Sequence, residues 1–272
     1  MSIYVWTSEI KNIYVWTTPV KEVYVWTTKI RPKLITTSWI YHNSTLWLIS
    51  LSKNGTSWYT ISDKHLWATQ VYNTWDTLSE ANCWKYYQWW NNYGFPFTWA
   101  TSTTGTRVSA AWYWPWNYYS SNKFIIENSG NWWDTSFSKN LWWWETGTVS
   151  AMQWPCQSGY HIPTKTEVDN IVSIWVSLWA WTSSWGTNFM KYLKIPLSWR
   201  LNRNTGAPFA VNAEARFWTT IYGNTNGNAV QLEAWSNHIY TQQYTTWFGL
   251  HIRPFKNVRE QPIDDWTWTK LY

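Results

Sequence analysis

The sequence predicts an α+β protein made mostly of short strands and long loops, with one or two helices and a small β-repeat at its start. Three observations support this prediction. Alternating β-branched and aromatic residues recur with a period of ten in residues 3–31. Short strand-like runs, such as residues 46–51, 58–61 and 250–255, stand among polar loops. Only one stretch, which begins at Thr164, shows clear helical periodicity.

The composition limits the class of protein. The 272 residues fit one large domain with short appendages, and a hydrophobic content of 45% is enough for a real core. Charged residues reach only 13%, so Thr, Ser and Asn must cover much of the surface. No apolar run reaches the roughly 18 residues of a membrane-spanning helix, so no membrane insertion is expected. No signal peptide is visible, because the first residues lack a basic segment followed by an apolar one.

The balance of tryptophan and glycine is abnormal. The chain has 31 Trp and 11 Gly, and many Trp stand where turns favour glycine, as in residues 114–116 (WPW) and 142–144 (WWW). Because glycine adopts positive φ freely, we interpret many of these Trp as UGA codons that the source bacterium reads as glycine under an alternative genetic code. A truly Trp-rich chain is the alternative. Trp58, Trp89 and Trp218 have strand-like surroundings and are expected to be genuine.

The first segment, residues 1–32, contains the ten-residue repeat. Its units begin with IYVWT at residues 3–7 and 13–17 and with VYVWT at residues 23–27, and Pro32 ends the repeat. This pattern predicts short strands joined by tight turns. Three such units bury little surface alone, so we expect a homo-oligomer through residues 3–31 or attachment to a larger assembly. A plain β-meander without a partner is the alternative that stays open.

Residues 38–257 are expected to form the main domain. The predicted helix begins at Thr164, with Glu167 three residues later as a capping box. Its apolar residues recur on one face at Val168, Ile171, Val172, Trp175 and Leu178. A second, weaker helix is expected to start near Asp76 and to run through Leu78, Ala81 and Cys83. Residues 258–272 are polar and are expected to be a tail or linker.

Four segments carry a family resemblance. They are residues 156–164 (CQSGYHIPT), 193–198 (LKIPLS), 217–220 (FWTT) and 249–257 (GLHIRPFKN). On these motifs, residues 46–257 resemble the Fibrobacter succinogenes major paralogous domain family, which has a C-type-lectin-like fold. The resemblance implies such a fold here. It becomes closer where Trp is read as glycine, as at Trp154 and Trp247.

One position departs from the family pattern. Pro254 stands where the family usually has the cysteine that would partner Cys156. Two alternatives follow for the candidate disulfide: Cys156 pairs with Cys83, or it stays a buried thiol. A disulfide would imply an oxidising location, whereas a small buried thiol packs well without a partner.

The sequence shows no catalytic constellation, and we expect neither an enzyme nor a metal or other cofactor. His161 lies at a helix start, where packing or capping is the simpler role, and Asp134 and Glu145 are merely two acids in a loop. Enzymes that make formylglycine share the fold of the resembled family but need paired reactive cysteines. Calcium-binding lectins of this fold use Glu-Pro-Asn or Gln-Pro-Asp with a neighbouring Trp-Asn-Asp as oxygen ligands, and the domain has neither. The net charge of +6 is spread along the chain, so no nucleic-acid partner is expected.

Ligand binding is the function that the sequence favours. A run rich in Tyr, Asn and Gln between Trp218 and Gly249 is typical of an adaptable recognition surface. The candidate ligand-binding residues are Tyr222, Asn224, Asn226, Asn228, Gln231, Glu233, Asn237, His238, Tyr240, Gln242, Gln243 and Tyr244. A diversified recognition surface and a plain exposed polar loop both stay open.

The predicted function is that of a non-enzymatic adhesion or receptor-recognition protein that binds a surface glycan or protein. Its expected location is extracellular, at the cell surface or on a virion. The alternatives are an enzyme of the formylglycine-generating type and a structural virion or surface protein.

Overall fold

A computed structural model of the chain describes residues 3–4, 14–15, 18–19, 23–25, 28–30, 40–74, 76–83, 85–88, 93–97, 124, 155–178, 185–198, 200–202, 204–209, 213–222, 228–235, 237–245, 248–262 and 267–271. Side chains are described for these residues except in 3–30 and at 178, 185, 221–222, 228–230 and 244–245.

The largest sheet has six antiparallel strands. Its order is β10 (Tyr160–His161), β17 (Phe255–Lys256), β8 (Trp58–Ser62), β7 (Leu48–Ser52), β6 (Ile40–Asn43) and β18 (Thr269–Lys270). Strands β6 to β8 form a meander, and β7 and β8 overlap the strand-like runs predicted at residues 46–51 and 58–61. Strand β17 joins it from nearly two hundred residues further along the chain, with Phe255 paired to Ile61.

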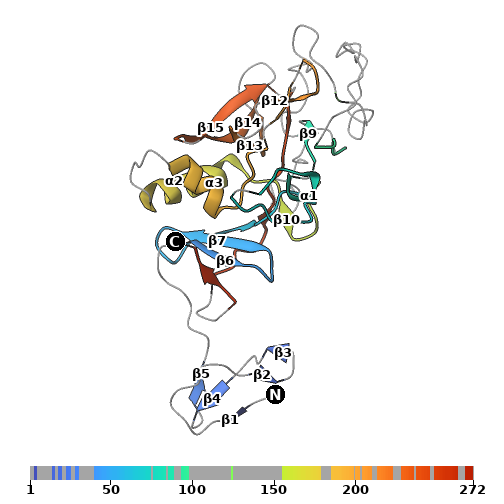
Figure 1. The fold of residues 1–272 in the computed structure, drawn as a ribbon. Coiled ribbons are helices and arrows are strands. Elements are labelled where there is room, and N and C mark those ends of the chain that lie inside the picture. Colours follow the sequence, from blue (N-terminus) through green and yellow to red (C-terminus); the bar gives the residue numbers. More distant parts are fainter. Residues whose placement is uncertain are drawn as a thin grey trace.

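A second, three-stranded sheet lies on the other side of the helices. It contains β13 (Ala215–Tyr222), β14 (Asn228–Ala234) and β15 (Ile239–Thr245), all antiparallel. Helices α2 (Lys165–Leu178) and α3 (Trp185–Tyr192) lie between this sheet and the six-stranded sheet (Figure 1). The main core fills the space between these layers and includes Ile49, Trp175, Phe217 and Leu232.

Smaller elements close one side of the domain. A four-stranded sheet has the order β12 (Pro208–Phe209), β11 (Arg200–Leu201), β16 (Gly249–Leu250) and β9 (Tyr87–Gln88), and the short helix α1 spans Glu80–Cys83. The indole of Trp218 joins β13 to this sheet, because its Nε1 donates a 2.7 Å hydrogen bond to the carbonyl of Tyr87.

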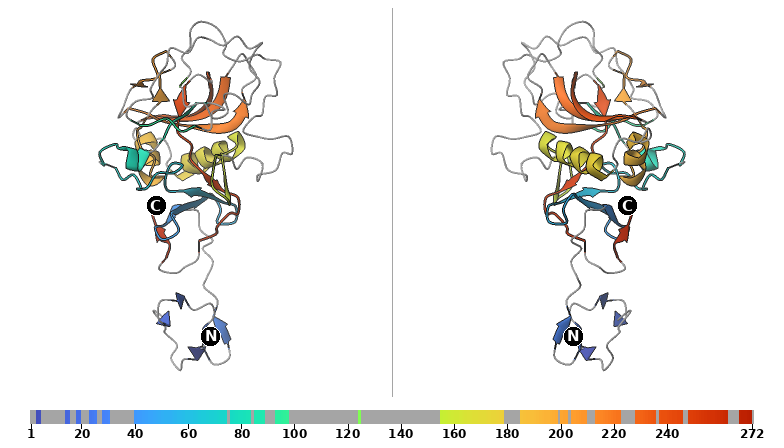
Figure 2. Two further views of the ribbon diagram at one scale, coloured as in Figure 1. Left: turned by 90° about the vertical axis from the view of Figure 1, so that its right-hand side faces the viewer. Right: turned by 90° about the vertical axis from the view of Figure 1, so that its left-hand side faces the viewer.

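The repeat segment forms short strands, as predicted. They are β1 (Ile3–Tyr4), β2 (Tyr14–Val15), β3 (Thr18–Pro19), β4 (Val23–Val25) and β5 (Thr28–Ile30). The pairs β2–β3 and β4–β5 are antiparallel, and β1 pairs with β4 in parallel. These strands lie apart from the other described elements (Figures 1 and 2). A partner for this segment stays a prediction.

The capping box at the start of α2 is confirmed. The Glu167 amide donates to Oγ1 of Thr164 at 3.1 Å, and the Thr164 amide donates to Oε2 of Glu167 at 2.9 Å. Nε2 of His161 also contacts the Glu167 carboxylate at 3.0 Å, and its Nδ1 lies 2.9 Å from Oδ1 of Asn257. The histidine therefore has the packing and capping role that was expected, and it ties the helix start to the end of β17.

Three expectations about elements need correction. Residues 258–272 are not simply a tail, because β18 pairs with β6 at the edge of the six-stranded sheet and Leu271 packs against the core. The weaker helix is shorter than expected and covers only Glu80–Cys83. Helix α3 was not predicted, since its few buried apolar residues fall within a helix of 8 residues, too short for a clear periodicity.

The capping box gives a stability prediction. Replacing Thr164 by Ala removes the hydroxyl that accepts the Glu167 amide, and we expect the free energy of unfolding to fall by about 1 kcal/mol. Urea unfolding followed by circular dichroism measures this change. Thr166→Ala is the matched control, because Thr166 is exposed in the same helical turn. Equal effects of the two substitutions would contradict a specific capping role.

Candidate functional site

The structure describes the predicted ligand-binding residues to different extents. Side chains are described for Gln231, Glu233, Asn237, His238, Tyr240, Gln242 and Gln243. Tyr222, Asn228 and Tyr244 are described only as backbone, at the ends of strands β13, β14 and β15. Asn224 and Asn226 lie outside the described residues.

Strand register gathers part of this set on one face of the three-stranded sheet. Gln231 pairs with Gln242, and Glu233 pairs with Tyr240. Because side chains alternate along a strand and Leu232 lies in the core, these four lie on the face turned away from α2 and α3. We call this the outer face.

The remaining described candidates lie elsewhere. Asn237 and His238 lie in the connection between β14 and β15, not on the outer face. On β15, Thr241 donates a 2.7 Å hydrogen bond to Asp169 of α2, so Gln243, two residues further along, belongs to the helix side. The predicted set is therefore divided between the two faces of the sheet and its turn.

A buried ionic cluster lies on the outer face. Arg216 NH2 lies 2.9 Å from Oε2 of Glu214 and 2.8 Å from Oε1 of Glu233, and all three side chains are buried. We call Glu214, Arg216, Gln231 and Glu233 the Glu233 cluster. Sequence reasoning found Gln231 and Glu233 but missed Glu214 and Arg216. The signal available was the alternation of charged and apolar residues over Glu214, Ala215, Arg216 and Phe217.

Burial and neighbouring charges determine the electrostatics of Glu233. Burial raises the pKa of its carboxyl above the ordinary value, the Arg216 guanidinium opposes this shift, and the nearby Glu214 adds to it. Two carboxylates therefore share one guanidinium in a buried setting. Such an arrangement stabilises the fold only when further hydrogen bonds satisfy the carboxylate oxygens.

Those further hydrogen bonds come from the surface. Nε1 of Trp235 and the hydroxyl of Tyr240 both donate to Oε1 of Glu233, the latter at 3.3 Å. The amide of Gln242 donates to Oε2, which Gln231 also approaches at 3.4 Å. Trp235 is 44% exposed and Tyr240 is 37% exposed. We call Trp235, Tyr240 and Gln242 the rim. All three donate hydrogen bonds to the buried Glu233 carboxylate, which fixes their positions.

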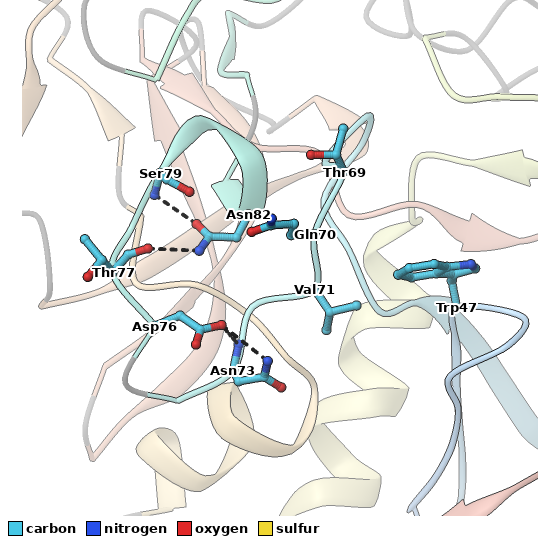
Figure 3. Close-up of a pocket in the computed structure, with 9 residues that line it drawn as sticks. All are labelled: Trp47, Thr69, Gln70, Val71, Asn73, Asp76, Thr77, Ser79 and Asn82. Carbon is cyan, nitrogen blue, oxygen red and sulfur yellow. Dashed lines mark hydrogen bonds between the residues drawn. The ribbon is translucent and has the colours of Figure 1, made fainter.

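A separate pocket of about 570 Å³ lies beside the turn between β6 and β7. It is lined by Trp47, Thr69, Gln70, Val71, Asn73, Asp76, Thr77, Ser79 and Asn82 (Figure 3). Several of its polar groups bond to one another. The Asn82 amide bridges the Ser79 amide and the Thr77 carbonyl, and Oδ2 of Asp76 accepts the backbone and side-chain amides of Asn73. These bonds order the loop that leads to α1, so we favour the outer face as the functional site.

The two cysteines are free, buried thiols. The disulfide candidate between Cys83 and Cys156 is therefore corrected in favour of the alternative that the sequence left open. Burial raises the pKa of the Cys83 thiol to about 12 and also raises the pKa of Cys156. Thiols with raised pKa hold little reactive thiolate at neutral pH.

Two histidines are buried, and one of them, His251, directly follows β16 of the four-stranded sheet. The rings of His65 and His251 stack with centroids 4.6 Å apart, and Tyr86 contacts the second ring at 4.2 Å. Burial lowers the pKa of His251 to about 4. Burial, the charge of His251 when protonated and the Arg253 guanidinium all lower the pKa of His65. Both imidazoles are therefore neutral in the folded protein at neutral pH.

This pair predicts acid destabilisation. Below pH 6.5 the unfolded chain binds protons that the folded chain does not, so stability falls as the pH drops from 6.5 toward 4. For His251 alone, the free energy of unfolding should be about 2 kcal/mol lower at pH 5 than at pH 7. Urea midpoints at the two pH values measure the change.

The control for this prediction compares two substitutions. The pH dependence should weaken in His251→Gln, which removes a buried imidazole, and should persist in His238→Gln, because His238 is exposed. A chain equally stable at pH 5 and pH 7 would contradict the prediction.

Comparison with protein-family models, with curated proteins and with solved structures finds no match for this chain. The resemblance to the C-type-lectin-like family therefore stays a prediction, and the α+β class rests on the structure itself. Within the described part of the chain, no helix has the length and apolar character needed to cross a membrane.

Proposed function

We propose that this chain is a non-enzymatic ligand-binding protein and that its rim binds a surface glycan. The observation that carries the proposal is the position of two exposed aromatic side chains, Trp235 and Tyr240, on one buried carboxylate. A rigid aromatic residue loses little conformational entropy on binding, and Glu233 reduces that loss further by holding both rings through their polar ends.

The chemistry of the rim favours an uncharged ligand. The Glu233 carboxylate accepts hydrogen bonds from the rim and from Arg216, so its negative charge is compensated by groups of the protein itself. What the rim offers outward is aromatic surface and the remaining capacity of the Gln242 amide. Sugar rings carry apolar C–H faces and hydroxyl groups, which suit an aromatic face and an amide respectively. A protein surface is the other ligand class that the sequence leaves open.

The thiols support a binding role over the enzymatic alternative. A formylglycine-type mechanism needs paired reactive cysteines, whereas Cys83 and Cys156 are unpaired, buried and raised in pKa. Cys156 packs among the apolar side chains of Ile162 and Leu250. The extracellular or virion location, the homo-oligomer and the structural alternative stay predictions.

The proposal predicts glycan binding that depends on Tyr240. The purified chain is applied to a panel of immobilised neutral glycans, and the affinity for a retained glycan is then measured by titration calorimetry. We expect Tyr240→Ala to weaken binding about tenfold, which corresponds to about 1.4 kcal/mol. Tyr240→Phe should weaken it less, because the ring stays but loses its bond to Glu233.

Gln243→Ala is the matched control, since it truncates an exposed side chain of the same strand on the side away from the rim. It should leave the affinity within about twofold of the original, a difference under 0.5 kcal/mol. Failure of the chain to retain any glycan, or equal affinity of Tyr240→Ala and the original chain, would overturn the proposal.

A further inference from the structure

Two tryptophans have a backbone conformation that suits glycine. Trp47 has a φ of 60° and Trp67 a φ of 64°. In this left-handed region the Cβ atom of an L-residue crowds its own backbone, so a bulky side chain there is a genuine outlier. Both indoles are also exposed, at 44% for Trp47 and 52% for Trp67. They bear both the backbone strain and the exposure of a large apolar surface.

Trp47 ends the turn between β6 and β7. Oδ1 of Asn43 accepts the amides of Thr45 at 3.1 Å and Leu46 at 2.9 Å, which forms an Asx-type turn. The next residue, Trp47, takes the left-handed conformation and leads directly into Leu48 of β7. Glycine is the usual residue at such a left-handed position of a turn, because it has no Cβ atom to crowd the backbone.

Trp67 occupies the third position of a β-turn. The turn is closed by a 3.0 Å hydrogen bond from the Ala68 amide to the His65 carbonyl. A positive φ at the third residue is the mark of a type II turn, which requires glycine or asparagine there. A tryptophan side chain does not suit this position, and glycine is the residue that fits it without strain.

The repeat segment adds an independent observation. In β2–β3, Val15 pairs with Thr18, and in β4–β5, Val25 pairs with Thr28, so two residues separate the strands of each hairpin. In both hairpins the sequence of those two residues is Trp-Thr. Two-residue connections between antiparallel strands favour glycine, and type II′ connections need it at the first position.

Other tryptophans have the opposite character. Trp58, Trp175 and Trp218 are buried, and none has a positive φ. The indole of Trp58 donates a 3.0 Å hydrogen bond to the Gly55 carbonyl, and the ring of Trp175 packs edge-on against Phe189. Glycine at these positions would leave a large cavity in the core.

We infer that the protein as its own host makes it carries glycine at positions 47 and 67, and tryptophan at positions 58, 175 and 218. The two groups of positions are therefore encoded by two different codons. The host translates the codon at positions 47 and 67 as glycine and the codon at positions 58, 175 and 218 as tryptophan. The same assignment extends to Trp16 and Trp26, the first residues of the two Trp-Thr connections between paired strands of the repeat.

Backbone strain kept for the sake of a binding site is the alternative explanation of the positive φ values of Trp47 and Trp67, and it explains them less well. Trp47 lines the pocket of Figure 3, where its indole stands apart from the hydrogen-bonded side chains and Lys64 lies 3.5 Å from its ring centre. Strain at a binding site would suit this residue alone. Trp67 has a similar φ of 64° and does not line that pocket, so a binding role for the pocket leaves the strain at Trp67 unexplained. Among the described non-glycine residues only Lys194 also has a positive φ, and it occupies the left-handed position after α3 where helices usually end.

The inference is tested on the gene and on the native protein. We expect UGA codons at positions 47 and 67 and UGG codons at 58, 175 and 218, and we expect peptide mass spectrometry of protein from the source organism to show glycine only at the first two. One codon shared by both groups, or a native peptide with tryptophan at position 47 or 67, would overturn the inference.

Variants of the expressed chain test the physical basis separately. Trp47→Gly and Trp67→Gly should each raise the thermal midpoint, on the order of 2 °C, because they relieve backbone strain. Trp58→Gly is the matched control and should lower the midpoint by about 10 °C or more, because it empties a buried site. A fall in the midpoint for Trp47→Gly and Trp67→Gly would contradict the strain argument.

Discussion

The buried guanidinium of Arg253 connects the layers of this protein. Its NH1 donates a 3.1 Å hydrogen bond to the Lys194 carbonyl, and its NH2 donates to the Leu193 carbonyl. These are free carbonyls at the end of α3, where a cation is favourable to the helix dipole. Arg253 itself lies in the chain between β16 and β17, so the contact joins the four-stranded sheet, the six-stranded sheet and the helix layer. Burial lowers its pKa to about 9, which leaves it charged at neutral pH.

The outer face depends indirectly on this contact, because the contact helps to position the helix layer on which the three-stranded sheet packs. The three-stranded sheet rests on α2 and α3 through apolar residues such as Phe217 and Leu232, so the helix layer determines where its other face points. On that face Arg216 and Glu233 form a second buried charged contact, and each oxygen of the Glu233 carboxylate accepts a hydrogen bond from a neighbouring strand. A buried charge network costs desolvation, and what it provides in return is a fixed position for the rim.

The two proposals rest on different tryptophans. The rim contains Trp235, whose φ is not positive. Its other two residues, Tyr240 and Gln242, are not tryptophans, so the codon assignment does not concern them. Glycine at positions 47 and 67 would remove exposed indoles from turns and leave the outer face unchanged. The assignment at positions 47 and 67 is therefore independent of ligand binding, whereas a glycine codon at position 235 would remove one of the two aromatic rings of the rim.

The sequence by itself determined the features that depend on neighbouring residues. The capping box of Thr164 and Glu167, the helix that follows it, the short strands of the repeat and the α+β class all come from local spacing, because caps and side-chain periodicity act over a few residues. Only the tertiary structure decided that β18 pairs with β6, that Arg216 lies between two carboxylates and that the predicted polar residues divide between two faces of a sheet. Those features depend on strand register and on contacts between distant segments, and a one-residue change of register would move every side chain to the other face.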